Sequence, residues 1–117
     1  MKNVVFMTCL EKAPDFCDYK EWCYNTWRYW CDKNDVEMFI LDQELQPTGG
    51  GVWTDEPGMK PTWQRWHVFD VLDANEIEYD NVALVDIDTM VHWDCPNFFE
   101  EANGEFGAIQ DRFFIEW

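Results

Sequence analysis

Short apolar runs alternate with an amphipathic stretch in the first half of the chain. Residues 4–9 form an apolar run close to the start, and residues 36–41 form a second one that ends at Asp42. Between them, from Asp18 to Lys33, apolar side chains recur at the three- and four-residue spacing of one face of an α-helix. We expect this face to lie in the core; it comprises Tyr19, Trp22, Cys23, Thr26, Trp27, Trp30 and Cys31. The pattern predicts a strand, a helix with Asp18 as its N-cap and a second strand, which together form a βαβ unit.

The second half of the chain begins with a long loop and then returns to the same alternation. Residues 43–60 are rich in glycine and proline and lack periodicity, so we expect a loop there. The segment 61–75 carries a proline at the first position and apolar residues at helical spacing, which predicts a helix. An apolar run at residues 82–86 predicts a third strand. Residues 96–102 predict a short helix, and residues 107–110 predict a fourth strand.

The order of these elements favours an α/β fold. Strands that alternate with helices are typical of a mostly parallel sheet with helices on both faces. We predict a three-layer αβα sandwich of Rossmann-like type, in which all 117 residues belong to a single domain. The sequence ends in the apolar segment 113–117 without a polar tail, so we expect that it is truncated at the carboxyl terminus.

The chain is strongly acidic. Its 24 acidic and eight basic residues give a formal net charge of -16, which repels nucleic acid and anionic membrane surfaces, so we expect no nucleic-acid partner. A hydrophobic content of 47%, with eight tryptophans, argues against disorder. No long apolar run is present, so we expect no transmembrane segment. The five cysteines include no Cys-x-x-Cys pair, and we expect a soluble protein of the cytoplasm or another intracellular compartment.

Two carboxylates, Asp86 and Asp88, come at the end of the third predicted strand, and we expect the chain to turn after them, at Thr89 and Met90. Open α/β sheets bind their ligands at the carboxyl ends of strands. Carboxylate oxygens are hard donors that suit Mg²⁺ or Mn²⁺, and such a cation can in turn hold a phosphate group. The alternative is a structural role, in which both carboxylates only cap the strand end and nearby loop amides. The pair by itself predicts a divalent cation site without specifying a reaction.

The surroundings of this pair resemble a known signature. Residues 79–99 contain Tyr-Asp-Asn, an apolar strand, Asp-x-Asp, a hydrophobic step, Asp94 and the aromatic pair Phe98-Phe99. This order resembles the signature of metal-dependent glycosyltransferases of the GT-A fold, in particular the glycogenin-like and galactosyltransferase-like families. Upstream, Trp63-Gln64-Arg65 looks like the start of the helix that leads into that motif. The resemblance implies an enzyme that transfers a sugar from a nucleotide-diphosphate donor to an acceptor hydroxyl, with Mn²⁺ or Mg²⁺ as cofactor.

The resemblance also implies roles for residues at three strand ends. Asp88 would bind the metal directly, and Asp86 would contact either the metal or the ribose of the nucleotide sugar. Thr8 and Cys9, at the end of the first predicted strand, match the place where such enzymes hold the nucleotide base. Asp42 ends the second predicted strand nearby. The resemblance assigns no catalytic residue.

Two basic residues flank the helix that precedes the acidic pair. One of them, Lys60 or Arg65, would reach the donor diphosphate, with Arg65 the better match to the family. Alternatively, Arg65 pairs with Asp70 or Glu76 on the surface. The third metal ligand and the acceptor-binding half of such enzymes have no counterpart in this sequence.

Two other functions compete with this one. A Mg²⁺-dependent phosphatase of the haloacid-dehalogenase type also places Asp-x-Asp after an apolar strand and uses the first Asp as nucleophile. That strand normally comes first in the chain, however, and Met90 stands where such enzymes carry Thr or Val. The other alternative is a non-catalytic, acidic module that binds a partner or a carbohydrate through Trp53, Trp63 and Trp93.

Overall fold

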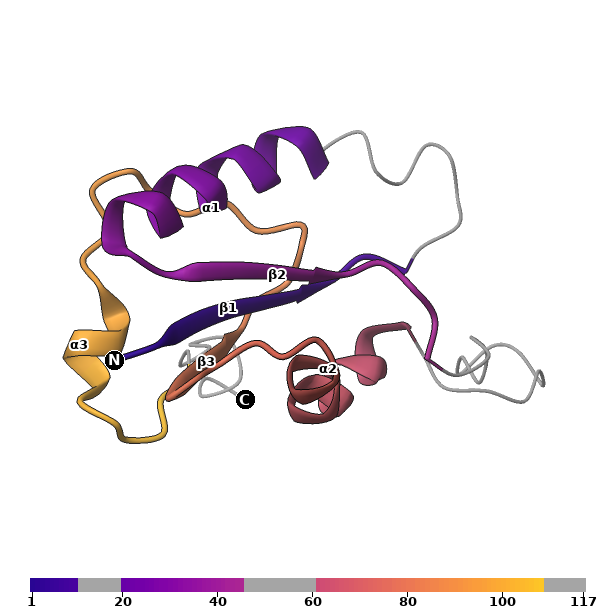
Figure 1. Cartoon of the computed structure of the whole chain (residues 1–117). Coiled ribbons are helices and arrows are strands. Elements are labelled where there is room, and N and C mark those ends of the chain that lie inside the picture. Colours follow the sequence, from indigo (N-terminus) through magenta and orange to yellow (C-terminus); the bar gives the residue numbers. More distant parts are fainter. Residues whose placement is uncertain (11–19, 46–60, 109–117) are drawn as a thin grey trace, which may run out of the picture.

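A computed structural model of the protein describes residues 1–10, 20–45 and 61–108 (Figure 1). The strands are β1 (Asn3–Thr8), β2 (Glu37–Leu41) and β3 (Asn81–Leu84), and they form a parallel sheet in the order β2-β1-β3. The helices are α1 (Lys20–Asn34), α2 (Val68–Ala74) and α3 (Phe98–Ala102), and the 3-10 helix η2 (Pro61–His67) leads directly into α2. These elements confirm the predicted α/β fold class. In this part of the chain no helix is long and apolar enough to cross a membrane.

Strand β1 is the centre of the sheet. Its residues 4–7 are at most 1% exposed, and it pairs on both sides, so that Val5 lies between Met38 of β2 and Ala83 of β3. A strand that is buried on both faces has to be apolar throughout, which explains why the sequence shows a continuous run here.

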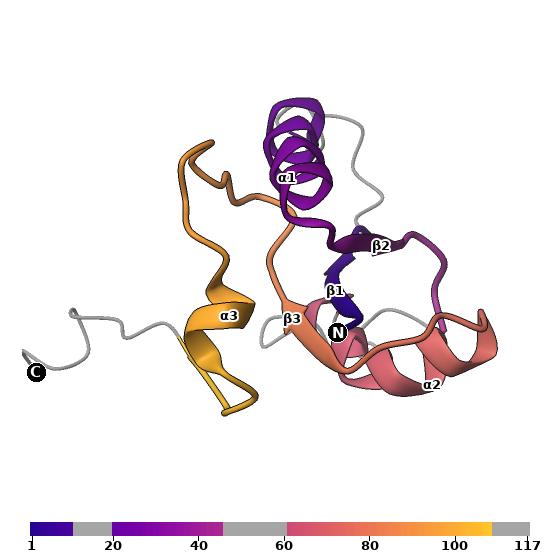
Figure 2. The ribbon, with the colours of Figure 1, turned by 60° about the vertical axis from the view of Figure 1, so that its left-hand side comes forward.

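Helices cover the two faces of β1. Figure 2 shows α1 on one side of the sheet and α2 on the other. The α1-side core consists of Val5, Met7, Trp27, Trp30, Cys31, Val36, Ile87 and Phe99. The α2-side core consists of Val4, Phe6, Leu10, Leu41, Val68, Val71 and Leu72. Alternate residues of β1 thus enter opposite cores, as the two-residue period of a strand requires.

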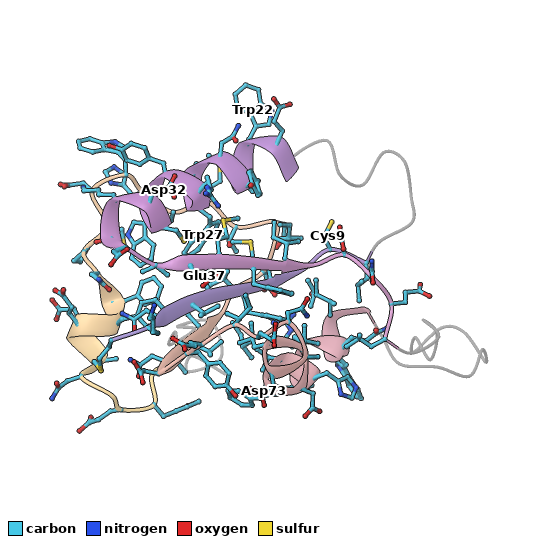
Figure 3. The ribbon with its side chains drawn as sticks, in the orientation of Figure 1. Cys9, Trp22, Trp27, Asp32, Glu37 and Asp73 are labelled. Atoms are coloured by element: carbon cyan, nitrogen blue, oxygen red, sulfur yellow. The ribbon has the colours of Figure 1, made fainter. Side chains whose placement is uncertain are left out.

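Helix α1 largely has the predicted apolar face. Cys23, Trp27, Trp30 and Cys31 are buried, but Trp22 is 69% exposed and points away from the sheet (Figure 3), so its predicted burial is wrong. Seven residues make nearly two turns of a helix, so Trp22 points in about the same direction as Tyr29, which is 57% exposed. Asp18, the predicted N-cap, and Tyr19 lie outside the described residues.

The carboxyl end of α1 has a left-handed cap. Asp35 has a φ of 55°, and the N–H of Val36 donates to the carbonyl of Cys31 at 2.9 Å. This is the Schellman arrangement, which ends a helix and satisfies a free carbonyl. It confirms the predicted break between the helix and β2.

Three boundaries in the second half differ from the predictions. The first part of the predicted helix 61–75 is a 3-10 helix, in which Gln64 is fully buried and its Oε1 accepts the N–H of Leu45 at 2.9 Å. Strand β3 ends at Leu84, because the chain then leaves the sheet in a turn. The predicted fourth strand, residues 107–110, is wrong in its first half, because residues 107–108 are exposed and pair with none of the described strands. Residues 109–110 lie outside the described residues.

Helix α1 also holds the segment that follows β3. The indole Nε1 of Trp27 donates to the carbonyl of Thr89 at 3.0 Å, and that of Trp30 donates to the carbonyl of Cys95 at 2.9 Å. Lys33 Nζ donates to the carbonyl of Trp93 at 3.1 Å. Buried indoles usually find an acceptor, and here the acceptors fix a segment that has no regular structure of its own.

We predict that Trp30→Phe lowers the free energy of unfolding by about 2 kcal/mol. The substitution removes the indole N–H that donates to the Cys95 carbonyl, and the smaller ring leaves part of a fully buried site empty. Urea denaturation measures this. The matched control is Trp22→Phe on the same helix, which should change stability by no more than about 0.5 kcal/mol because Trp22 is exposed. Equal effects of the two substitutions would contradict the packing described here.

We also predict that Cys31 resists alkylation. Burial, with a smaller contribution from Asp32, raises the pKa of the Cys31 thiol from 9.0 to about 11, so that little thiolate forms at about pH 8. Peptide mass spectrometry after iodoacetamide treatment should show Cys31 labelled far more slowly than the partly exposed Cys95. The contribution of the raised pKa to stability is fully present below pH 9.0 and is lost as the pH rises through about 11. Rapid labelling of Cys31 in the folded protein would refute this burial.

Candidate functional site

The acidic pair lies on a turn directly after β3. Val85 N still donates to the carbonyl of Phe6 in β1 at 3.0 Å, and the chain then turns, with Thr89 N donating to the carbonyl of Asp86 at 3.2 Å. Between the two carboxylates, Ile87 is only 7% exposed and packs in the α1-side core, whereas Asp86 and Asp88 are both exposed. The turn is centred on residues 87–88, slightly earlier than predicted. One buried apolar side chain therefore anchors a turn that presents two carboxylates to solvent.

The position of this turn in the sheet is that of a ligand site. After β1 the chain adds β2 on one side of β1 and then β3 on the other side. The order of the strands therefore switches between β1 and β3. Open α/β sheets bind ligands outside the carboxyl ends of the strands at such a point. The register between β1 and β3 ends with Phe6 opposite Leu84, two residues before Thr8 at the end of β1 and two residues before Asp86 on the turn.

Arg65 joins the acidic pair to η2. Its Nη2 lies 2.8 Å from Oδ1 of Asp86, and its side chain is 26% exposed. Among the described residues, the ion pair of Arg65 is therefore with Asp86 and not with Asp70 or Glu76, because the fold brings η2 to the end of β3. One of the few cations of an acidic chain thus lies beside the predicted cation site.

The other predicted residues are spread more widely. Cys9, just after β1, packs against the α1-side core, and its N–H donates to the carbonyl of Leu41 at 2.8 Å. Asp42 follows β2 and lines an open depression of about 460 Å³ between β2 and α2, which does not include Asp86 or Asp88. β1 separates β2 from β3, so Asp42 lies two strands away from the acidic pair. Lys60 lies outside the described residues.

Asp86 and Asp88 fit a divalent cation only in part. Within residues 1–10, 20–45 and 61–108 there is no group of three or more His, Cys, Asp or Glu side chains that could hold a metal ion. Mg²⁺, however, is commonly bound through one or two carboxylates together with substrate phosphates and water. The pair suits a cation that arrives with a phosphorylated ligand.

Comparisons with protein-family models, with curated proteins and with solved structures found no match. A proposal about function therefore depends on the residues and geometry of the site. The residues around the acidic pair, including those that the sequence did not single out, carry the argument.

Thr89 and Trp27 belong to the site although the sequence did not point to them. Thr89 Oγ1 donates to the carbonyl of Asp86 at 2.6 Å, and Trp27 Nε1 lies 3.2 Å from the same Oγ1. Threonine hydroxyls often donate to a backbone carbonyl three or four residues earlier, and this local pattern could have marked Thr89. Helical spacing predicts that Trp27 is buried, but it contains no information about the acceptor of its indole N–H.

We predict that Arg65 and Asp86 are coupled more strongly than an ordinary surface pair. A double-mutant cycle with Arg65→Ala and Asp86→Ala, followed by urea denaturation, should give a coupling of about 1 kcal/mol, because the contact is short and Arg65 is largely buried. The comparison pair is Arg28 and Asp32, exposed on α1 at 3.4 Å, for which we expect about 0.3 kcal/mol. A coupling for Arg65 and Asp86 no larger than that of the comparison pair would show that the contact is not maintained in solution.

Proposed function

We propose that the chain is the nucleotide-sugar-binding part of a metal-dependent glycosyltransferase, and that its sheet belongs to a three-layer, Rossmann-like αβα sandwich of the GT-A type. The observation that carries the proposal is the exposed turn with Asp86 and Asp88 at the carboxyl end of β3, beside β1 at the point where the strand order reverses. The order of residues around the turn, from Tyr79 to Phe99, agrees with this function.

Each residue near the turn has a role that its chemistry supports. A divalent cation, when bound, offsets the charge that develops on a departing diphosphate. Asp88 and Asp86 supply the carboxylate oxygens for it, and the Arg65 guanidinium orients Asp86 and offers further donors to a phosphate or a sugar hydroxyl. Under this proposal Thr8 and Cys9, at the end of the neighbouring strand, would contact the nucleoside.

Electrostatics gives a reason why these groups occur together. A net charge of -16 repels a nucleoside diphosphate over the whole surface. Binding therefore requires a local positive charge, and the combination of Arg65 with a cation on Asp88 and Asp86 provides it at one place. The proposed reaction transfers a sugar to an acceptor hydroxyl.

The binding-module alternative is supported by a different observation. Trp63 and Trp93 are 57% and 64% exposed, and exposed tryptophans are common in surfaces that bind carbohydrates or proteins. Trp53 lies outside the described residues. The phosphatase alternative has no such support, because the strand that leads into the acidic pair is the third along the chain.

We predict that Mn²⁺ together with UDP or GDP raises the melting temperature of the protein. A ligand at about 100 times its Kd adds about 2.7 kcal/mol of stability, which amounts to several degrees in a thermal melt. Asp88→Ala should abolish this shift, whereas Glu101→Ala, which removes an exposed carboxylate of α3 outside the motif, should retain it. If melting of the wild-type protein is indifferent to Mn²⁺ with either nucleotide, the donor-site proposal fails and the binding module becomes the better candidate.

A further inference from the structure

The turn that carries the acidic pair is connected to α1 through a short chain of hydrogen bonds. Trp27 Nε1 donates to the carbonyl and to Oγ1 of Thr89, at 3.0 and 3.2 Å. Thr89 in turn donates to the carbonyl of Asp86 from its N–H at 3.2 Å and from its Oγ1 at 2.6 Å. The Thr89 hydroxyl thus accepts a bond from the helix and donates one to the turn, an arrangement in which the bonds polarise each other.

Packing fixes the indole that begins this chain. Trp27 is 7% exposed, and its ring meets Trp30 edge-on at 5.9 Å and Phe98 at 6.4 Å between centroids. In Figure 3, Trp27 lies between α1 and the sheet. An indole with so little room to move presents its N–H in one direction. The donor is rigid, although the turn that receives it is exposed.

A second bond from the same helix restrains the other end of the turn. Thr26 Oγ1 accepts the N–H of Val91 at 3.2 Å. The backbone is therefore held to α1 at Thr89 and again at Val91. Trp30 is also a buried indole donor, and its hydrogen bond goes to the carbonyl of Cys95, seven residues beyond Asp88.

We propose that Trp27 is a positioning residue for the cation site: through Thr89 it fixes the turn that carries Asp86 and Asp88. This inference rests on the proposed function, because it assumes that the two carboxylates bind a divalent cation. A cation requires its ligands at defined positions, and groups behind the ligands that hold them in place have large effects on affinity. Trp27 touches neither carboxylate, so it acts only through the backbone of the turn.

The test compares two buried tryptophans whose indole N–H groups donate to different residues: Trp27 to Thr89, and Trp30 to Cys95. Trp27→Phe and Trp30→Phe each keep a buried aromatic ring and remove one indole donor. Binding of Mn²⁺ to the full chain in the presence of UDP is measured by equilibrium dialysis, as the excess of Mn²⁺ on the protein side. The specific part is the binding that Asp88→Ala removes, since an acidic surface also binds Mn²⁺ without specificity.

We expect Trp27→Phe to weaken the specific Mn²⁺ binding by about 10-fold. Trp30→Phe should leave it unchanged even though it destabilises the fold. Loss of stability alone would affect the two variants alike, so only a positioning role separates them. Equal Mn²⁺ affinity in Trp27→Phe and the wild type, or an equal loss in both variants, would overturn the inference.

Substitutions of Thr89 provide a second measurement that does not disturb the core, because Thr89 is exposed. Thr89→Val removes the hydroxyl and should weaken Mn²⁺ binding as Trp27→Phe does. Thr89→Ser keeps the hydroxyl and should restore wild-type affinity. Unchanged affinity in Thr89→Val would contradict the role of the hydrogen-bond chain. If the wild-type protein shows no Mn²⁺ binding that depends on Asp88, the proposed function itself fails, and this outcome is distinct from failure of the inference alone.

Discussion

Burial of β1 on both faces is the constraint from which the rest of the architecture follows. Residues 4–7 have no side chain exposed to water, so each face of the strand needs a helix and each edge needs a neighbouring strand. Parallel neighbours in turn require crossover connections, which place α1 on one face and α2 on the other. The same connections bring the carboxyl ends of the three strands to one edge of the sheet. The candidate site is therefore a consequence of the way in which β1 is covered.

The α1-side core and the acidic pair are parts of one structure. Ile87 enters that core between two carboxylates that remain in water, and Trp27 reaches from the same core to the carbonyl of Thr89. Apolar burial on one side of the backbone thus determines where the polar groups emerge on the other. A candidate site built in this way is supported by packed, buried side chains, which is what holding ligands at fixed positions requires.

Charge is distributed unevenly in relation to this site. The chain as a whole is strongly acidic, yet Arg65 is directed at Asp86 from a largely buried position. A guanidinium at this place lowers the local excess of negative charge and leaves donors for an anionic or hydroxylated ligand. The described residues that line the depression near Asp42 include no Lys or Arg, and the depression lies on the far side of β1 from the acidic pair. Electrostatics therefore favours the β1–β3 edge as the binding position.

The sequence alone determined the order of the three strands and the helices, the apolar continuity of β1 and the place of two aspartates at the end of the third strand, because each of these depends on the spacing of nearby residues. It also placed a break between the first helix and the second strand. Only the tertiary structure decided that Arg65 pairs with Asp86, that Trp27 donates to Thr89 and that residues 107–108 pair with none of the described strands. These outcomes depend on residues up to 62 positions apart, as for Trp27 and Thr89. Local periodicity shows which side of an element is buried, but the partner of a polar group depends on how the elements pack.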